Sequence, residues 1–260
     1  MVVYRITHVD QRKVMPATRS SILDDKYSKA ILLLAILFFS WLLSVKNFVA
    51  DWARSAEESL SSTTPNILLI VVDDLGYDDT TAINSGGLPT PNIKQLALEG
   101  VTFRRHYADS TCTPSRVAML TGRYPERSGF RPVGSEIPAE FLTIAEQLKD
   151  AGYATYLTGK WHAGEERPEA WPQNKGFDHW FGFLNQWELS EEITASKRVL
   201  RKPTYHNPML REDGGKQKRY SGHLTDILTE HTLRKLEQLQ ASGKPWFLYH
   251  AFLAPHHPIQ

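Results

Sequence analysis

Cys112 is the only cysteine in this 260-residue sequence, so the chain cannot form an internal disulfide. A lone cysteine is more often a small buried apolar group than a reactive one, and its neighbours must indicate otherwise. A helix is predicted to begin at Pro114, because proline suits the first turn, and to end at Gly122. The positive end of that helix and the nearby Arg116 would surround Cys112 with a field that favours an anionic ligand.

Three other polar clusters could act together with Cys112. They are Asp73 with Asp74, Lys160 with His162, and His256 with His257. Adjacent carboxylates are costly without a cation beside them, and a hard divalent ion such as calcium is the usual solution. A helix cap or a solvated turn is the alternative interpretation of the Asp pair.

Three apolar runs precede these clusters and are predicted to be buried strands, over residues 66–72, 153–158 and 246–253. Predicted helices alternate with them, which indicates an α/β fold with a mostly parallel central sheet and helices on both faces. Ligands bind such sheets beyond the carboxyl ends of the strands. The three clusters are therefore expected to meet at one edge of the sheet.

The helices are predicted from their caps and their periodicity. One begins at Pro91 and ends at Gly100, with Ile93, Leu96 and Ala97 expected to face inward. Thr143 and Glu146 form a capping-box pattern before a short helix, and a helical period returns over 221–242. Residues 172–220, which are irregular and rich in Trp, Pro, Gly and charge, are predicted to be surface loops.

The residues around Cys112 resemble the signature of the type I sulfatases, which are formylglycine-dependent enzymes of the alkaline phosphatase superfamily. That signature is Cys-x-Pro-x-Arg followed by an apolar pair, Thr and Gly, and the segment Cys112–Arg123 contains each of these residues. Two further segments resemble other marks of the family, namely 152–162 (GYATYLTGKWH) and 254–260 (APHHPIQ). The resemblance covers 65–260 and implies an alkaline-phosphatase-like sandwich.

The resemblance also implies a mechanism. A formylglycine-generating enzyme would oxidise Cys112 to Cα-formylglycine, whose hydrated aldehyde attacks sulfur. Calcium would be held by Asp73, Asp74 and the modified residue 112. The resemblance implies that Arg116 positions the nucleophile and that His162 is the general base. It also implies that Lys160 and His256 stabilise the sulfate and protonate the leaving alcohol. His256 is preferred to His257 because of its distance from the strand end.

The family completes its metal site with a downstream Asp-Asn pair and a further Lys, which this sequence does not contain after 254–260. We therefore expect either a part of a longer sulfatase or a truncated product that binds metal poorly. Two other functions remain open: a phosphomonoesterase or phosphonate hydrolase of the same superfamily, and an inactive module that binds sulfated glycans. The substrate, a sulfated carbohydrate or an aryl sulfate, is not decided by the sequence.

The first 64 residues have a different character from the rest. A mostly basic leader over 1–29 precedes sixteen uncharged residues that begin at Ala30, which is typical of a signal peptide or a signal-anchor over 30–50. A Ser/Thr-rich linker follows over 51–64, and the catalytic domain is expected over 65–260. The prediction is an exported protein, periplasmic or anchored so that it faces the periplasm or the extracellular side.

Composition excludes one class of partner. Thirty Lys and Arg oppose 29 Asp and Glu, so the net charge is +1 and no overall basic surface indicates nucleic acid. The expected partners are a sulfate ester, the formylglycine-generating enzyme, and a membrane through 30–50.

Overall fold

The computed structural model describes residues 37, 38, 40, 41, 43–47, 64–129, 133–193, 196 and 198–258. The chain divides into two compact units, Met1–Thr63 and Thr64–Gln260. Most of the predicted membrane or signal segment, 30–50, lies outside the described residues, as do the leader and nearly all of the linker. Within the described part, no helix combines the length and the apolar character needed to cross a bilayer.

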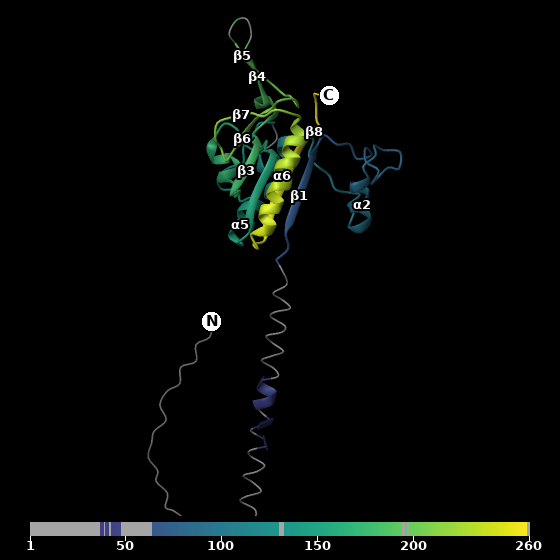
Figure 1. The fold of residues 1–260 in the computed structure, drawn as a ribbon, viewed down its shortest axis with the longest axis vertical. Helices are drawn as coiled ribbons and strands as arrows, with labels where there is room; N and C mark the ends of the chain where they lie inside the picture. Colours follow the sequence, from purple (N-terminus) through teal and green to yellow (C-terminus); the bar gives the residue numbers. More distant parts are fainter. Residues whose placement is uncertain are drawn as a thin grey trace, which may run out of the picture. The chain divides into compact units, whose positions relative to one another are not determined.

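The second unit is built on a six-stranded sheet in the order β1-β8-β2-β3-β6-β7 (Figure 1). The first four of these strands are parallel to one another, whereas β6 is antiparallel to both β3 and β7. The bounds are β1 Ile67–Asp73, β2 Ala154–Lys160, β3 His179–Phe183, β6 Met209–Glu212, β7 Lys218–Arg219 and β8 Trp246–Pro255. The predicted mixed α/β fold with a mostly parallel sheet is confirmed.

Helices cover both faces of this sheet. Alternate residues of a strand point to opposite faces, so Leu157 and Tyr249 enter one apolar cluster while Tyr156 and Leu248 enter the other. The first cluster includes side chains of α3 (Cys112–Thr121) and α5 (Ile144–Asp150), and the second packs beneath α6 (Leu224–Ala241). The sheet is thus held between two layers, and its strand ends are fixed by packing on each side.

The close pairing of β2 with its neighbours requires glycine. Gly159 has φ +104°, and a Cβ placed on it would lie 1.9 Å from the carbonyl oxygen of Ala251 on β8. Gly182 on β3 in turn approaches the carbonyl of Gly159. Any side chain at either position would separate the strands next to Lys160.

Two predictions about local structure are wrong. Residues 172–220 are not all loop, because β3 and β6 join the central sheet and Trp180 and Phe181 enter its cores. The helix α2 (Pro91–Glu99) forms where expected, but no residue in it is buried and Leu96 is 64% exposed. By contrast, α5 begins with the predicted capping box between Thr143 and Glu146.

The remaining elements are short. They are α4 (Pro125–Ser128), the 3₁₀ helices η1 (Pro168–Ala170), η2 (Pro172–Asn174) and η3 (Gln186–Leu189), and the antiparallel pair β4 (Ser190–Ile193) and β5 (Val199–Lys202). Glu188 of η3 accepts a hydrogen bond from the backbone N–H of Leu184 just after β3 and faces Arg211 of β6. This contact fastens the segment between β3 and β6 to the sheet.

Candidate active site

A buried charge cluster joins the carboxyl ends of β1 and β2. Lys160 Nζ donates a hydrogen bond of 2.5 Å to Asp73 Oδ2, and Arg116 Nη2 lies 3.6 Å from Asp73 Oδ1. All three side chains are almost fully buried. Burial opposes ionisation of Asp73, but the charges of Arg116 and Lys160 outweigh it and hold the pKa of this carboxyl below its usual value.

Arg116 is fixed on α3 by two further contacts. Its Nη1 donates to the carbonyl oxygen of Lys160 at 2.9 Å and to Tyr249 Oη at 3.0 Å. Nη2 is buried and has no hydrogen-bond partner among the described residues. The guanidinium is therefore held rigidly with one donor group still available to an anion.

His162 follows β2 and adds a second unpartnered group. Its backbone has φ 50°, in the left-handed region, and its buried Nδ1 has no hydrogen-bond partner in the described part of the chain. Burial, followed by the charges of Lys160 and Arg116, lowers the pKa of His162 to about 3. The imidazole is consequently neutral at neutral pH.

Cys112 is the first residue of α3, after the N-cap Thr111. Its thiol is free and half-buried. Burial, followed by the charge of Arg116, lowers the pKa of Lys160, and Cys112 lies close enough for a thiolate to oppose part of that shift. Cys112 thus borders the same charge cluster, at the positive end of a helix as the sequence predicts.

The adjacent carboxylates of Asp73 and Asp74 face different partners. Asp74 has φ 62° and a side chain that is 57% exposed, and its Oδ2 lies 3.7 Å from Nε2 of the buried His256. His256 Nδ1 donates to the carbonyl oxygen of His257 at 2.7 Å, and Tyr205 Oη donates to the carbonyl of His256 at the same distance. The structure thus brings the predicted residues to one edge of the sheet, where Asp74 is exposed to solvent and His256 is buried beside it.

The donor types fit the predicted calcium ion. Carboxylate oxygens are its preferred ligands, and Asp73 and Asp74 are consecutive at the end of β1. Two carboxylates supply at most about four of the six to eight oxygen ligands that calcium takes. In this structure the Asp73 oxygens face Lys160 and Arg116, so the ion would have to share this carboxylate with the cations of the chain.

Sequence reasoning missed Tyr249 and Tyr205. Tyr249 is an interior residue of β8, and an apolar run gives no sign that a tyrosine hydroxyl will orient an arginine on a distant helix. Tyr205 lies in the segment predicted to be loop, so its contact with the backbone of His256 had no local signal. Both are long-range contacts that only the assembled sheet creates.

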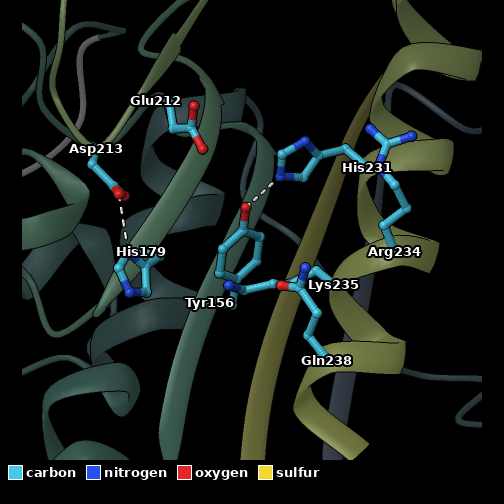
Figure 2. A pocket seen from close by; sticks show the side chains of 8 residues that line it. All are labelled: Tyr156, His179, Glu212, Asp213, His231, Arg234, Lys235 and Gln238. Atoms are coloured by element: carbon cyan, nitrogen blue, oxygen red, sulfur yellow. Dashed lines mark hydrogen bonds and ion pairs between the residues drawn. The ribbon is translucent and has the colours of Figure 1, made fainter. Parts of the chain in front are cut away.

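A cavity of about 160 Å³ lies elsewhere, between the sheet and α6, and none of the predicted residues line it (Figure 2). Tyr156 Oη and His231 Nε2 are 2.6 Å apart there, and His179 Nδ1 lies 2.9 Å from Asp213 Oδ2. Burial lowers the pKa of His231 to about 4. We do not assign the active site to this cavity, because it lies apart from Cys112, Arg116 and Lys160.

Comparison with known proteins identifies the domain. The Sulfatase family profile matches residues 65–260. N-acetylgalactosamine-6-sulfatase from Canis lupus familiaris is 34% identical over 214 residues, which cover 75% of this chain and 40% of that protein. The chain therefore spans well under half the length of this curated relative.

Solved structures agree with this match. Ps i-CgsB in complex with k-i-k-neocarrahexaose has a TM-score of 0.65 and 32% identity, covering 76% of this chain and 47% of that one. A structure in complex with its substrate D-glucosamine-2-N,6-O-disulfate has a TM-score of 0.56 and 31% identity, covering 75% of this chain and 35% of that one. With a matching profile over three quarters of its residues and a shared fold, this chain belongs to the sulfatase family.

Proposed function

We propose that this chain provides the catalytic face of an enzyme that hydrolyses sulfate esters. The observation that carries the proposal is a pair of buried atoms beside Lys160 and the N-terminus of α3, Arg116 Nη2 and His162 Nδ1, which have no hydrogen-bond partner in the described part of the chain. A buried polar atom without a partner is costly, so such a pair indicates a ligand that completes it. A tetrahedral anion with several acceptor oxygens fits the donors of Arg116 and Lys160, and Nδ1 of the neutral His162 is left to accept a proton.

Two further groups would complete the chemistry. Formylglycine made from Cys112 would supply a nucleophilic hydroxyl, and calcium at Asp73 and Asp74 would polarise the sulfate oxygens. Arg116, anchored through Lys160 and Tyr249, places a fixed positive charge against the anion. Lys160 adds a second charge from the end of β2, and burial strengthens both interactions.

Proton transfer falls to the two histidines. We assign to Nδ1 of His162, which has no hydrogen-bond partner in the described part of the chain, the proton from a hydroxyl on residue 112. His256 keeps its Nδ1 hydrogen bonded to the carbonyl of His257, so its Nε2 is the nitrogen that faces the site. With Asp74 beside that nitrogen, a protonated His256 can donate to the oxygen of the leaving alcohol.

A sulfated carbohydrate is the proposed substrate class. One relative is named as a sulfatase of N-acetylgalactosamine 6-sulfate, and another was solved with a disulfated glucosamine as its substrate. Aryl sulfates remain useful probes of the same chemistry. A phosphomonoesterase or phosphonate hydrolase is the second candidate, and the Cys112–Gly122 motif argues against it.

The surroundings of the enzyme are part of the proposal. We propose that 65–260 is the catalytic domain and that 30–50 exports the protein, either as a cleaved signal or as an anchor in the membrane. A formylglycine-generating enzyme would be the partner that modifies Cys112.

The test uses protein purified from its native source, with peptide mass mapping of residue 112 and matched assays of 4-nitrophenyl sulfate and 4-nitrophenyl phosphate. We expect an aldehyde at residue 112 and release of sulfate, both lost in Cys112→Ala. Ser115→Ala is the control on the same helix, because the Ser115 hydroxyl bonds only to backbone carbonyls. Retained sulfate release in Cys112→Ala, or a preference for the phosphate ester, would overturn the proposal.

A further inference from the structure

We propose that Asp74, His256 and His257 form a site for a borderline divalent metal ion such as Zn²⁺, and that an ion bound there blocks hydrolysis. One carboxylate oxygen and one nitrogen of each ring lie within 4.8 Å of one another. No other three His, Cys, Asp or Glu side chains converge in this way among the residues that the structure describes. The blocking effect rests on the proposed function, whereas binding of the ion does not.

The donor set selects the class of metal. Imidazole nitrogens suit zinc, copper, nickel and iron, whereas calcium takes oxygen ligands. Two histidines and one carboxylate therefore favour a different ion from the calcium predicted for Asp73 and Asp74. The two sites share Asp74 and cannot use it freely at the same time.

His256 already has the orientation of a metal ligand. Its Nδ1 donates to the carbonyl of His257 at 2.7 Å, which leaves the lone pair on Nε2. Metal-binding histidines almost always donate their other nitrogen to such an acceptor. The Tyr205 hydroxyl holds the backbone of the same residue, and the rings of His256 and His257 stack 4.4 Å apart at 19°.

The other two ligands can move to close around an ion. Asp74 and His257 are exposed at the solvent side of the site, whereas His256 is buried. Donors about 2.1 Å from a tetrahedral zinc ion lie about 3.4 Å apart. Rotation of the two exposed side chains toward His256 can bring the present separations into that range, and solvent provides the entry path.

An ion in this site would remove two groups from the proposed reaction. Asp74 would no longer be available to calcium, and His256 would coordinate metal through Nε2, the nitrogen proposed to serve the leaving alcohol. The expected result is reversible inhibition by zinc that chelation relieves. Excess calcium would compete with zinc only for Asp74, the one residue that the two sites share.

The first test is titration of the full chain, without an affinity tag, with Co²⁺ alone, followed by visible absorption and calorimetry. We expect one ion per chain and binding weaker by about tenfold or more in His257→Ala, since even outer partners of a metal site are worth about tenfold to a hundredfold. His179→Ala is the matched control, because it removes another exposed histidine that faces a carboxylate. Equal Co²⁺ binding by wild type and His257→Ala would overturn the site.

Asp74→Asn is the second variant, with circular dichroism as a check of folding in each protein. Weakened Co²⁺ binding in this variant is also expected, and unchanged binding would remove Asp74 from the site. Sulfate ester assays with added Zn²⁺ then test the block: wild type should lose its rate and His257→Ala should resist, each relative to its own rate without zinc. Zinc binding without inhibition would overturn the block, whereas absence of any hydrolysis would defeat the proposed function and leave the metal site standing.

Discussion

Lys160 and Asp73 form a 2.5 Å ion pair although their strands, β2 and β1, are not neighbours in the sheet. Strand β8 lies between them and pairs with both. Asp73 and Lys160 are the last residues of β1 and β2, and both side chains are buried where they meet. This ion pair therefore ties the first and third strands of the sheet together at the candidate active site.

Removing one partner of this pair should destabilise the protein more than removing both. Lys160→Met leaves the buried Asp73 carboxylate with only the longer contact to Arg116, and breaking a buried pair costs about 3–5 kcal/mol. Adding Asp73→Asn to that variant should restore part of the loss, because the buried carboxylate is then neutral, and Arg116 keeps its hydrogen bonds to Lys160 O and Tyr249 Oη. Urea unfolding of wild type, both single variants and the double variant measures the coupling, and strictly additive losses would contradict it.

Arg116→Lys should weaken binding of inorganic sulfate. Lysine keeps the charge but cannot donate to Lys160 O, Tyr249 Oη and an anion from one planar group. A lost hydrogen bond to a charged ligand is worth about 1.5–3 kcal/mol, so binding should fall by about tenfold or more. The rise of the melting temperature with sulfate, against chloride at equal ionic strength, measures this, and Arg123→Lys is the control. Equal sulfate protection in both variants would exclude Arg116 from the anion site.

Gly159→Ala should be far more damaging than Gly152→Ala. Both glycines have positive φ, +104° and +90°, so each substitution carries a backbone strain of about 1–2 kcal/mol. Only the Gly159 substitution also drives a Cβ into the backbone of Ala251, whereas nothing lies within 4 Å at Gly152. We expect a loss of at least about 3 kcal/mol in the unfolding free energy for Gly159→Ala. A similar loss in the two variants would show that strain, not close packing, governs β2.

The stability of the protein should fall between pH 7 and pH 5 in part because of His250. Burial lowers the pKa of His250 to about 4, and its Nδ1 lies 2.6 Å from Thr232 Oγ1. The unfolded state binds a proton near pH 6.5, whereas the folded state does so only near pH 4. The contribution of neutral His250 to the free energy of unfolding is therefore fully present above about pH 6.5 and is lost as the pH decreases toward 4.

The contribution of His250 between pH 7 and pH 5 should be on the order of 2 kcal/mol. His250→Gln removes the titration, and its unfolding free energy should depend less on pH than that of wild type. His206→Gln, at an exposed histidine, is the control. Urea unfolding measures the pH dependence of both proteins. If it is equal in the His250 variant and in wild type, His250 is not a cause of the loss of stability at low pH.

The sequence predicts the strands of the site well, because β1, β2 and β8 are apolar runs that end abruptly in charged or ionisable residues. It predicts β3 and β6 poorly. Their segment mixes Trp and Gly with charges, and only pairing with β2 and burial of side chains such as Trp180 make them strands. Tertiary packing outweighs local pattern in these elements.

Side-chain positions, like the strands, can be predicted from the sequence where they depend on local spacing and not where they depend on tertiary structure. The residues near Cys112 form a contiguous motif on one helix, so their proximity follows from spacing. The divergence of Asp73 from Asp74 does not, because it depends on the left-handed φ of Asp74, and no local residue pattern specifies that angle. The exposure of Leu96 on α2 was also unpredictable, since a helical pattern states which face is apolar but not what packs against it.

The place of β8 in the sheet governs when this site can form. It is the last of the six strands in the chain, yet it lies between β1 and β2. During synthesis on the ribosome, β1, α3 and β2 emerge without the strand that joins them, and Asp73 cannot be held next to Lys160. Until β8 is released, Cys112 stands on an unassembled polypeptide, where the enzyme proposed to modify this thiol would reach it before the site forms.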